Sequence, residues 1–472
     1  MSFSSNKCQF FLIYVKIVCK EVYGNNMTEK HLNKLREQIN QLDNQIIDIL
    51  DSRSKIVTKI GKLKDHSKGV VDENREQEVL DRLIKISKGN YSKNTIIRIW
   101  RELFESSSKL QIKNTSNIET KRTIEKIEIY KGGKSQTDSN EQLNIIKLSS
   151  NENPLGPSKK ISENIKLNNL NRYPEITGKT LRNNLAKFHN IESEQIVLGC
   201  GSDEVLLFAA LSFCQSGDEI IHSEYGFEMY AIITKVVGAI SKLAKEKNYK
   251  LSVSSICEQI TPATKLIYIA NPNNPTGSYL SKEEIRELMS KIPKNIIVVL
   301  DGAYSEYVEK DDYDSKFLLV KEFNNIILTR TFSKAYGLAG IRLGWCYTSV
   351  KVASILNKVK GPFNTNSIAQ KIALIALKDQ NHIQLSLKEN KRNKEWFEKE
   401  LKKLGIKTLQ TYSNFSFIES TIEVAKNIAD NLEKEGILIR QLNSYNLPHC
   451  LRITIGKMKD MQQIIKIIEG LI

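Results

Sequence analysis

The hydrophobic residues of the first quarter of the chain follow a helical pattern. Over 32–63 they recur at steps of three and four positions, which predicts one long amphipathic helix. A break at 67–69 and a candidate N-cap at Asp72 precede a second helix over 74–87, and a third is expected over 93–111. A helix of about 30 residues is roughly 45 Å long. We expect its apolar side to need a partner, which makes this part an all-α domain that forms an intertwined dimer.

A different pattern begins at about residue 125, where short apolar runs alternate with helical stretches. Fully apolar runs between helices predict an α/β domain with a parallel sheet covered on both faces. Ligands of such folds bind at the carboxyl ends of the strands. The predicted strands include Gln195–Leu198, Glu219–His222, Lys265–Ala270, Asn295–Leu300 and Asn325–Leu328.

The segment before the long helix is a separate question. Its apolar run over 8–19 is only about 12 residues long, and a membrane span needs roughly 20. A signal peptide is an alternative, although no small-residue cleavage site follows the run. The predicted division is an unstructured extension over 1–26, a helical domain over 27–111, a polar linker over 112–124 and an α/β domain over 125–472.

Charge and cysteine content narrow the class of protein. Lys and Arg number 70 against 54 Asp and Glu, which gives a net charge of +16. The positive charges are spread along the sequence without a block of five or six, which favours a lysine-rich surface over a nucleic-acid footprint. The seven cysteines are scattered and lack zinc-site spacing. We therefore expect a cytoplasmic protein with reduced thiols and with no metal, nucleic-acid or membrane partner.

Polar loops follow three of the predicted strands. They read Asn271-Pro-Asn-Asn-Pro-Thr-Gly277, Asp301-Gly-Ala-Tyr304 and Thr329-Arg-Thr-Phe-Ser-Lys334, the last continuing to Arg342. Together with Ser150–Gly156, Asn171–Pro174 and Leu451–Gly456, these loops resemble the fold type I, class I/II aminotransferases. The closest likeness is to histidinol-phosphate aminotransferases, and it covers about 125–472. The resemblance implies pyridoxal 5′-phosphate as cofactor and a dimer.

The chemistry of that cofactor explains why these residue types are needed. An amine must form an imine with the cofactor aldehyde and later move a proton between Cα and C4′, and Lys334 is the candidate. A carboxylate must face the pyridine nitrogen to keep it protonated, and Asp301 stands at a strand end. Asn274 and Tyr304 can bond the phenolic oxygen and tune the proton affinity of the imine.

The phosphate needs amide donors at a helix N-terminus and a fixed cation. Gly201, Ser202 and Asp203 open a helix after a predicted strand, and Ser333 and Arg342 supply the remaining donors.

Further roles come from the resemblance alone. It implies that Phe227 stacks on the cofactor ring, with Tyr225 as an alternative, and that Tyr173 reaches the phosphate of the neighbouring subunit. It also assigns Asn153 and Arg452 to substrate binding, Arg452 as the clamp on an anionic group.

Two cations interrupt the apolar stripe of the long helix. Arg53 and Lys64 lie eleven residues apart on one face, where cations are costly unless they meet anions. Arg36 points about 100° away and could instead serve the site of a partner subunit.

This region resembles the all-helical chorismate mutases over about 30–111. The matching motifs read Leu35-Arg-Glu-Gln-Ile, Leu50-Asp-Ser-Arg53, Gly61-Lys-Leu-Lys64, Asp72-Glu-Asn-Arg75-Glu76 and Ser107-Ser-Lys-Leu-Gln111. The implied site comprises Arg36 of the other subunit, Arg53, Lys64, Asp72, Arg75, Glu76, Ser107 and Gln111.

The resemblance also implies how these residues act. Chorismate is a dianion whose rearrangement needs only a compact conformation and stabilised charge on the ether oxygen. The two arginines Arg36 and Arg53 would hold carboxylates, and Lys64 and Gln111 would donate to the ether oxygen. Glu76 and the region of Asp72 would take the ring hydroxyl.

The sequence thus predicts a bifunctional, cytoplasmic, homodimeric enzyme. One half converts chorismate to prephenate. The other transaminates prephenate, phenylpyruvate or 4-hydroxyphenylpyruvate with glutamate as donor, an inference that rests on the fusion. Histidinol phosphate is the competing substrate or a second one. A decarboxylase, or a helical domain that only senses aromatic metabolites, are the further alternatives.

Overall fold

A computed structural model describes the backbone of residues 5–64, 71–111, 120–130, 132–134, 145–166 and 168–471, and the side chains from Glu29 on apart from that of Arg122. The chain divides into two compact units. One comprises 1–86 and 99–119, and the other comprises 87–98 and 120–472.

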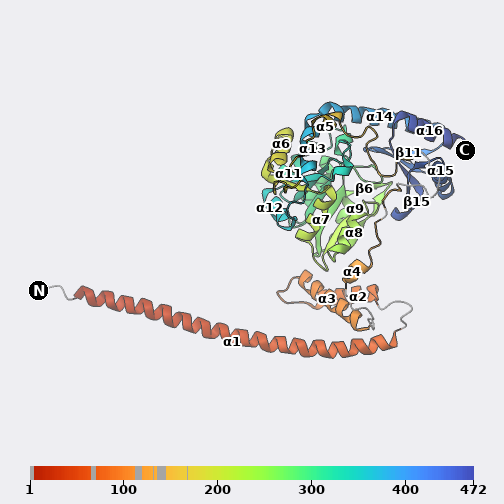
Figure 1. Ribbon diagram of the computed structural model, residues 1–472. Coiled ribbons are helices and arrows are strands. Elements are labelled where there is room, and N and C mark those ends of the chain that lie inside the picture. Colours follow the sequence, from red (N-terminus) through yellow and green to blue (C-terminus); the bar gives the residue numbers. More distant parts are fainter. Residues whose placement is uncertain are drawn as a thin grey trace. The chain divides into compact units, whose positions relative to one another are not determined.

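Three helices make up the N-terminal region, as predicted: α1 (Ser5–Leu63), α2 (Glu73–Ile86) and α3 (Lys93–Gln111) (Figure 1). Asp72 is the N-cap of α2, because its Oδ1 accepts a hydrogen bond of 2.9 Å from the backbone N–H of Arg75. The predicted break at 67–69 lies outside the described residues.

The start of α1 differs from the expectation of an unstructured segment over 1–26. The helix begins at Ser5 and continues without interruption. The sequence before residue 64 contains no proline, so no residue there lacks the backbone N–H that an α-helix uses. The short length of the apolar run over 8–19 argues against a membrane span, but it does not exclude a helix.

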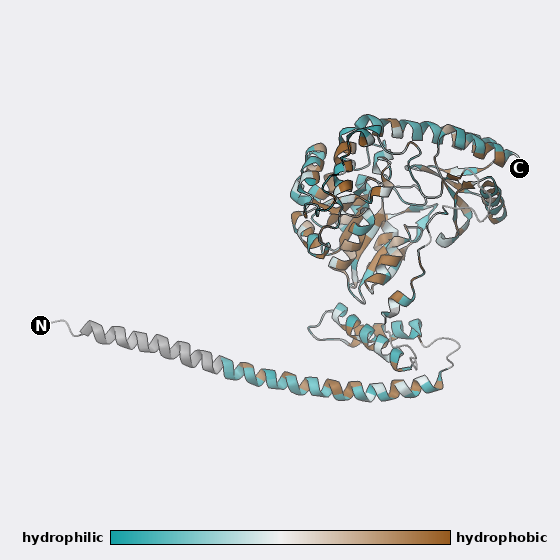
Figure 2. Ribbon diagram, in the orientation of Figure 1, coloured by the Kyte–Doolittle hydropathy of each residue, from teal (hydrophilic) through white to brown (hydrophobic). Residues whose placement is uncertain are grey.

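One side of α1 exposes hydrophobic residues to solvent. Leu35 is 43% exposed, and Ile39, Leu42 and Ile46 are 56%, 56% and 52% exposed. Figure 2 shows such positions along α1, separated by hydrophilic ones. Burial is confined to a few positions such as Val57, at 7% exposure. Most of the apolar stripe is therefore uncovered within one chain.

The second unit is built on a seven-stranded sheet in the order β2-β10-β9-β8-β7-β3-β4. The strands in chain order are β2 (Ile196–Gly199), β3 (Glu219–Ser223), β4 (Ile240–Ala244), β7 (Thr264–Ala270), β8 (Ile297–Asp301), β9 (Ile326–Thr331) and β10 (Gly344–Thr348). The five predicted strands correspond to β2, β3, β7, β8 and β9.

The sheet is parallel except at β10, which is antiparallel to both β2 and β9. The expectation of a parallel sheet is therefore wrong for this strand. The connection over 332–343, which the structure describes throughout, contains only a 3-10 turn at Ala339–Ile341. Because a parallel connection normally needs a crossover helix, the chain turns back instead.

Both faces of the sheet are covered by helices (Figure 1). In β8, Val298 and Leu300 belong to one buried cluster while Ile297 and Val299 belong to the other, as the alternation of a strand requires. The helices contributing to the first cluster include α6 (Lys179–His189), α10 (Lys282–Lys291), α11 (Leu318–Glu322) and α13 (Ser367–Lys378). Those contributing to the second include α7 (Ser202–Phe213), α8 (Met229–Val236) and α12 (Val350–Val359).

A smaller sheet follows in the order β11-β12-β15-β14. Its strands are β11 (Lys407–Leu409), β12 (Phe415–Glu419), β14 (Arg440–Leu442) and β15 (Leu447–Thr454), and three helices share a third buried cluster with it: α14 (Gln380–Lys403), α15 (Ile422–Lys434) and α16 (Met458–Glu469). The shorter elements are α4 (Arg122–Glu125), β1 (Ile146–Lys147), α5 (Lys159–Asn164), β5 (Glu246–Lys247), β6 (Lys250–Leu251), α9 (Val253–Cys257) and β13 (Ile437–Leu438). The predicted linker over 112–124 lies mostly outside the described residues, and α4 occupies its end.

Among the residues that the structure describes, no helix is long and apolar enough to cross a membrane. The same residues contain no group of three or more His, Cys, Asp or Glu side chains that could hold a metal ion.

Candidate active sites

A cavity of about 230 Å³ opens at the carboxyl ends of β7, β8 and β9, where ligands of such sheets bind. Nine residues singled out from the sequence line it: Ser202, Asp203, Phe227, Asn274, Asp301, Tyr304, Ser333, Lys334 and Arg342. The sequence reasoning did not assign a role to Ser150, Glu152, Ala270, Pro272, Ala303, Thr331 or Ala339, which line it as well.

Asp301 is the last residue of β8 and is only 6% exposed. Its Oδ1 accepts a hydrogen bond of 2.8 Å from the Thr329 hydroxyl, and its Oδ2 accepts one of 2.9 Å from the Tyr230 hydroxyl. Burial nevertheless raises the pKa of Asp301 above its ordinary value. A cation placed beside this carboxylate would compensate for the lost hydration, so the cavity suits a protonated ring nitrogen here.

Lys334 follows β9 after a tight turn, in which the backbone N–H of Ser333 donates to the Thr331 hydroxyl at 3.1 Å. The Lys334 amine donates to the Ser150 carbonyl at 3.4 Å and lies 5.6 Å from the centre of the Tyr304 ring. The long hydrogen bond holds the amine only weakly. It is therefore free to react with a ligand in the cavity.

The N-terminus of α7 forms one wall of the cavity. Gly201 precedes it at φ 86°, and a Cβ on this residue would lie 2.6 Å from Nη2 of Arg342. The Arg342 guanidinium is held by Asp203 Oδ2 at 3.2 Å and by the Ala339 carbonyl at 3.0 Å. Amide donors at a helix N-terminus beside a fixed guanidinium suit a phosphate group.

Phe227 and Tyr225 occupy different environments. Phe227 lines the cavity, and its ring lies edge-on to Tyr230 at 5.9 Å. Tyr225 packs instead near Tyr249, at 6.1 Å between ring centres, and against a buried cluster that includes Phe417. The structure therefore favours Phe227 as the aromatic residue available to a cofactor ring.

Arg452 lies on β15 and is 6% exposed. Its Nη1 donates to Asn274 Oδ1 at 2.5 Å and its Nη2 donates to the Ser149 carbonyl at 2.6 Å. Its Nε is buried and has no hydrogen-bond partner among the described residues. Burial lowers the pKa of Arg452, so an anion would be a favourable partner for this side chain.

The sequence reasoning did not identify Arg440, which is paired with Arg452 in register on the neighbouring strand β14. Its Nη2 bonds Glu228 at 3.2 Å, and the two side chains are 15% and 18% exposed. Arg440 and Arg452 lie twelve positions apart, five before and four after the segment 445–448, and assuming an antiparallel hairpin around that segment could have paired them. Two guanidinium groups therefore come from adjacent strands.

Asn153 and Tyr173 lie outside the set of residues that line the cavity. The Asn153 amide donates to the Ala335 carbonyl at 2.9 Å and to the Ser386 hydroxyl at 3.0 Å. It therefore supports the turn after Lys334 within one chain. Tyr173 is 81% exposed and stacks on Phe363 at 4.5 Å.

The helical unit brings several other predicted residues together. Nη1 of Arg53 on α1 donates to the Ser107 hydroxyl on α3 at 2.6 Å, and Ser107 is 8% exposed. Glu76 near the start of α2 accepts from Arg101 on α3 at 3.3 Å. A guanidinium and a carboxylate are thus held by hydrogen bonds between helices.

Gln111 ends α3 close to α1. A Cβ on Gly61 would lie 2.8 Å from Cγ of Gln111, so a glycine at this position allows the approach. Oε1 of Gln111 is buried and has no hydrogen-bond partner in the described part of the chain. Lys64 directly follows α1, three residues after Gly61. Together with Glu76 on α2, these residues give the helical unit polar groups from all three helices.

Three predicted residues do not join this set within one chain. Arg36 bonds Asn33 on its own helix at 3.3 Å and precedes Arg53 by about 25 Å of helix. The Asp72 carboxylate caps α2. Arg75 pairs with Glu78 at 2.9 Å, and both side chains are about two-thirds exposed (67% and 66%).

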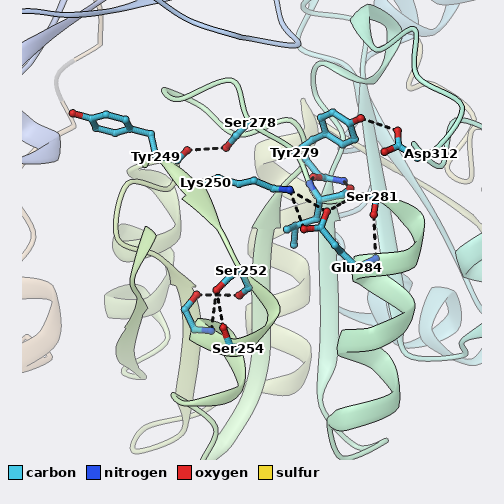
Figure 3. A network of polar contacts seen from close by, with 12 residues as sticks. Tyr249, Lys250, Ser252, Ser254, Ser278, Tyr279, Ser281, Glu284 and Asp312 are labelled. Atoms are coloured by element: carbon cyan, nitrogen blue, oxygen red, sulfur yellow. Dashed lines mark hydrogen bonds and ion pairs between the residues drawn. The ribbon is translucent and has the colours of Figure 1, made fainter. Parts of the chain in front are cut away.

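A second polar region lies apart from the main cavity (Figure 3). Lys250 bonds Glu284 at 2.9 Å, and the Tyr279 hydroxyl donates to Asp312 at 2.7 Å. Ser281 and Glu284 form a capping box at the start of α10. Because these charged groups already have partners, their contacts serve to hold β6, which carries Lys250, against α10, which carries Glu284.

Comparisons with known proteins agree with the two-part organisation. The family model "Aminotransferase class I and II" matches residues 144–468, and "Chorismate mutase type II" matches residues 35–112. A histidinol-phosphate aminotransferase of Roseobacter denitrificans is 40% identical over 342 residues, covering 72% of this chain and 94% of that protein. Its counterpart in Pelagibacter ubique is 41% identical over 352 residues, covering 73% and 97%.

Solved structures support the fold of the larger unit. The histidinol-phosphate aminotransferase of Sinorhizobium meliloti, in complex with pyridoxal-5′-phosphate, superposes with a TM-score of 0.69 at 21% identity and covers 76% of this chain and 100% of that one. The enzyme from Clostridium acetobutylicum has a TM-score of 0.64 at 25% identity and covers 69% and 99%.

Proposed function

Because this chain belongs to the class I and II aminotransferases and also carries a chorismate mutase domain, we propose that it catalyses two reactions. The helical unit converts chorismate to prephenate, and the larger unit transaminates histidinol phosphate. The observation that carries the second assignment is the 40% identity to a histidinol-phosphate aminotransferase along 94% of its length.

The cofactor of the larger unit is pyridoxal 5′-phosphate, and the cavity fits it. Asp301 suits the protonated pyridine nitrogen, because its burial raises its pKa and leaves the carboxylate short of a cation. The N-terminus of α7, Ser333 and Arg342 suit the phosphate. When bound, the cofactor supplies an electron sink for the bond that breaks at the substrate Cα.

The residues of this chain then have separate tasks. Lys334 holds and moves the proton at Cα, as its weakly bound amine allows. Phe227 limits one side of the cavity and excludes water there. Arg452 and Arg440 supply positive charge for the anionic end of the substrate. Either a phosphate or a carboxylate satisfies a guanidinium.

An aromatic oxo acid, prephenate included, is the second candidate substrate. The observation that favours it is the covalent union of the two units, since prephenate is itself an oxo acid and glutamate is a common amino donor. Decarboxylation is a third reaction for this fold. Turnover that requires an amino donor would indicate transamination and not decarboxylation.

The helical unit needs no proton transfer for its proposed reaction. Arg53, fixed by Ser107 at 2.6 Å, can hold one substrate carboxylate in a compact geometry. Lys64 and Gln111 can donate to the ether oxygen as charge develops there, and Glu76 can accept from the ring hydroxyl.

We also propose a homodimer. The exposed apolar stripe of α1 suits the same stripe of a second chain, and this would bring a partner's Arg36 to a site that its own chain cannot reach. Tyr173, exposed and outside the cavity of its own chain, would likewise serve a neighbour. Light scattering of the purified protein tests this, and a monomer with full mutase activity would refute it.

Direct assays test the two activities. Purified enzyme is given chorismate, and separately histidinol phosphate with 2-oxoglutarate, or each aromatic oxo acid with glutamate. We expect prephenate formation that Arg53→Ala abolishes, and a higher kcat/KM for histidinol phosphate. Absence of prephenate would favour the sensor alternative. A higher kcat/KM for an aromatic substrate would reverse the order of the two candidates.

A further inference from the structure

We propose that Asn151 is a positioning residue that directs the hydroxyl proton of Tyr304 into the cofactor cavity. Nδ2 of Asn151 donates to the Tyr304 hydroxyl oxygen at 2.9 Å. The two residues are 2% and 4% exposed, so solvent does not compete for this bond. The inference depends on the cofactor role of Tyr304 and not on which substrate the enzyme prefers.

The orientation of the Asn151 amide is fixed by a closed pair of hydrogen bonds. Its backbone N–H donates to the Thr454 hydroxyl at 2.9 Å, and that hydroxyl donates to Oδ1 of the same asparagine at 3.0 Å. Rotating the amide by half a turn would take away the acceptor of the Thr454 proton, for which the described residues offer no other, and Thr454 is only 1% exposed. The orientation with the NH₂ side facing Tyr304 is therefore the favoured one.

The backbone of Asn151 is held as well. It adopts φ 55°, a left-handed conformation that asparagine tolerates better than most residues. Nδ2 of Asn414 donates to its carbonyl at 2.9 Å. Three chain segments that are far apart in sequence thus determine where one amide hydrogen points.

The consequence for Tyr304 follows from counting its hydrogens. A phenolic hydroxyl has one proton to donate and can accept. Because Asn151 donates to the oxygen, the Tyr304 proton is not used in that contact and remains available to an acceptor in the cavity, which Tyr304 lines. The phenolic oxygen of the cofactor is such an acceptor.

A hydrogen bond from Tyr304 to that oxygen affects the pH at which the cofactor-bound enzyme loses a proton. When bound, the cofactor would carry a proton held in part by its phenolic oxygen, and a hydrogen bond from Tyr304 to that oxygen would weaken the hold of the oxygen on the proton. The pH midpoint of the visible absorption change is therefore lowered by Tyr304. One hydrogen bond to a charged group corresponds to about one to two pH units.

The test compares three single variants, one double variant and one control variant of the full-length holoenzyme by spectrophotometric pH titration. Tyr304→Phe should raise the midpoint by about one to two units. Asn151→Asp offers acceptor oxygens where the amide hydrogens were, so it should turn the Tyr304 proton away and raise the midpoint similarly. Asn151→Ala, which leaves the hydroxyl unheld, should raise it by less.

A double variant separates positioning from a simple charge effect. In the Tyr304→Phe background, Asn151→Asp should add only a small further shift, because the proton that it redirects is absent. Asn393→Asp is the matched control, since Asn393 is also 2% exposed but donates to the Gly456 carbonyl away from the cavity. It should leave the midpoint unchanged.

Two results would overturn the proposal. One is an unchanged midpoint in both Asn151 variants that retain native circular dichroism and bound cofactor. The other is a shift from Asn151→Asp that persists undiminished without the Tyr304 hydroxyl. An Asn151 variant that loses transamination without any shift of the midpoint would show that Asn151 does not act through Tyr304. If instead the enzyme failed to transaminate the proposed substrates, the titrations could still be interpreted, because they need only the bound cofactor.

Discussion

Nη1 of Arg452 lies 2.5 Å from Oδ1 of Asn274, so one hydrogen bond joins the arginine assigned to the substrate to an asparagine that lines the cofactor cavity. The bond connects β15 of the small sheet with the loop after β7 of the large one, 178 positions apart in the sequence. A substitution of Arg452 should therefore alter the surroundings of the cofactor as well as the binding of the substrate.

Arg452→Lys tests this relationship. A lysine keeps the charge but cannot bond Asn274 and Ser149 in the same planar arrangement. We expect kcat/KM for the amino donor to fall by about 10- to 100-fold. The absorption titration of the substrate-free holoenzyme should shift as well. If only KM rose and the absorption titration were unaltered, the hydrogen bond from Arg452 to Asn274 would have no effect on the cofactor.

Asp301→Asn removes the carboxylate that faces the cavity while preserving its shape. The amide can still accept from Thr329 or Tyr230, but it cannot hold a proton on the pyridine nitrogen through charge. Transamination should slow by at least about 100-fold. Single-turnover absorbance changes measure this rate. Retained cofactor binding is the control, and near-normal turnover would contradict the assignment of Asp301.

Gly61→Ala probes the approach of α3 to α1 in the helical unit. Alanine favours a helix by about 1 kcal/mol relative to glycine, yet its Cβ would lie 2.8 Å from Cγ of Gln111. We expect prephenate formation to fall as Gln111 is displaced, while the transaminase activity is unchanged. Lys59→Ala, an exposed change on the same helix, is a suitable control. Equal mutase activity in both variants would contradict the role of Gly61.

Glu246→Gln tests a pH dependence of stability. Burial raises the pKa of Glu246 to about 7, although the Ser223 hydroxyl and Asn273 Nδ2 at 3.1 Å donate to its Oε1. The folded state therefore binds more protons than the unfolded state between about pH 4.5 and 7, and stability decreases as pH rises through that window. Glutamine should raise the melting temperature at pH 8 and change it little at pH 5.

Thermal unfolding followed by circular dichroism checks this expectation. The gain at pH 8 should correspond to about 1–2 kcal/mol. Glu258→Gln, the same substitution at an exposed acid, is the control. If the gain in stability were the same at pH 5 and pH 8, it would come from packing and not from the ionisation of Glu246.

The sequence by itself determined most of the elements and suggested which residues would react. The spacing of apolar residues and the breaks between them predicted the three helices, and short apolar runs predicted β2, β3, β7, β8 and β9. These elements could be predicted because they depend on residues that are close to one another along the chain. Lys334 and Asp301 could be proposed on a similar basis, since Asp301 ends β8 and Lys334 comes three residues after β9.

Tertiary structure alone decided which side chains meet. It selected Phe227 over Tyr225, moved Asn153 out of the cavity and placed Arg440 beside Arg452. The antiparallel course of β10 and the helical start of α1 were likewise not foreseen. Contacts such as Asn151 with Tyr304 join positions 153 residues apart, and packing, not periodicity, determines the distance and direction of such hydrogen bonds.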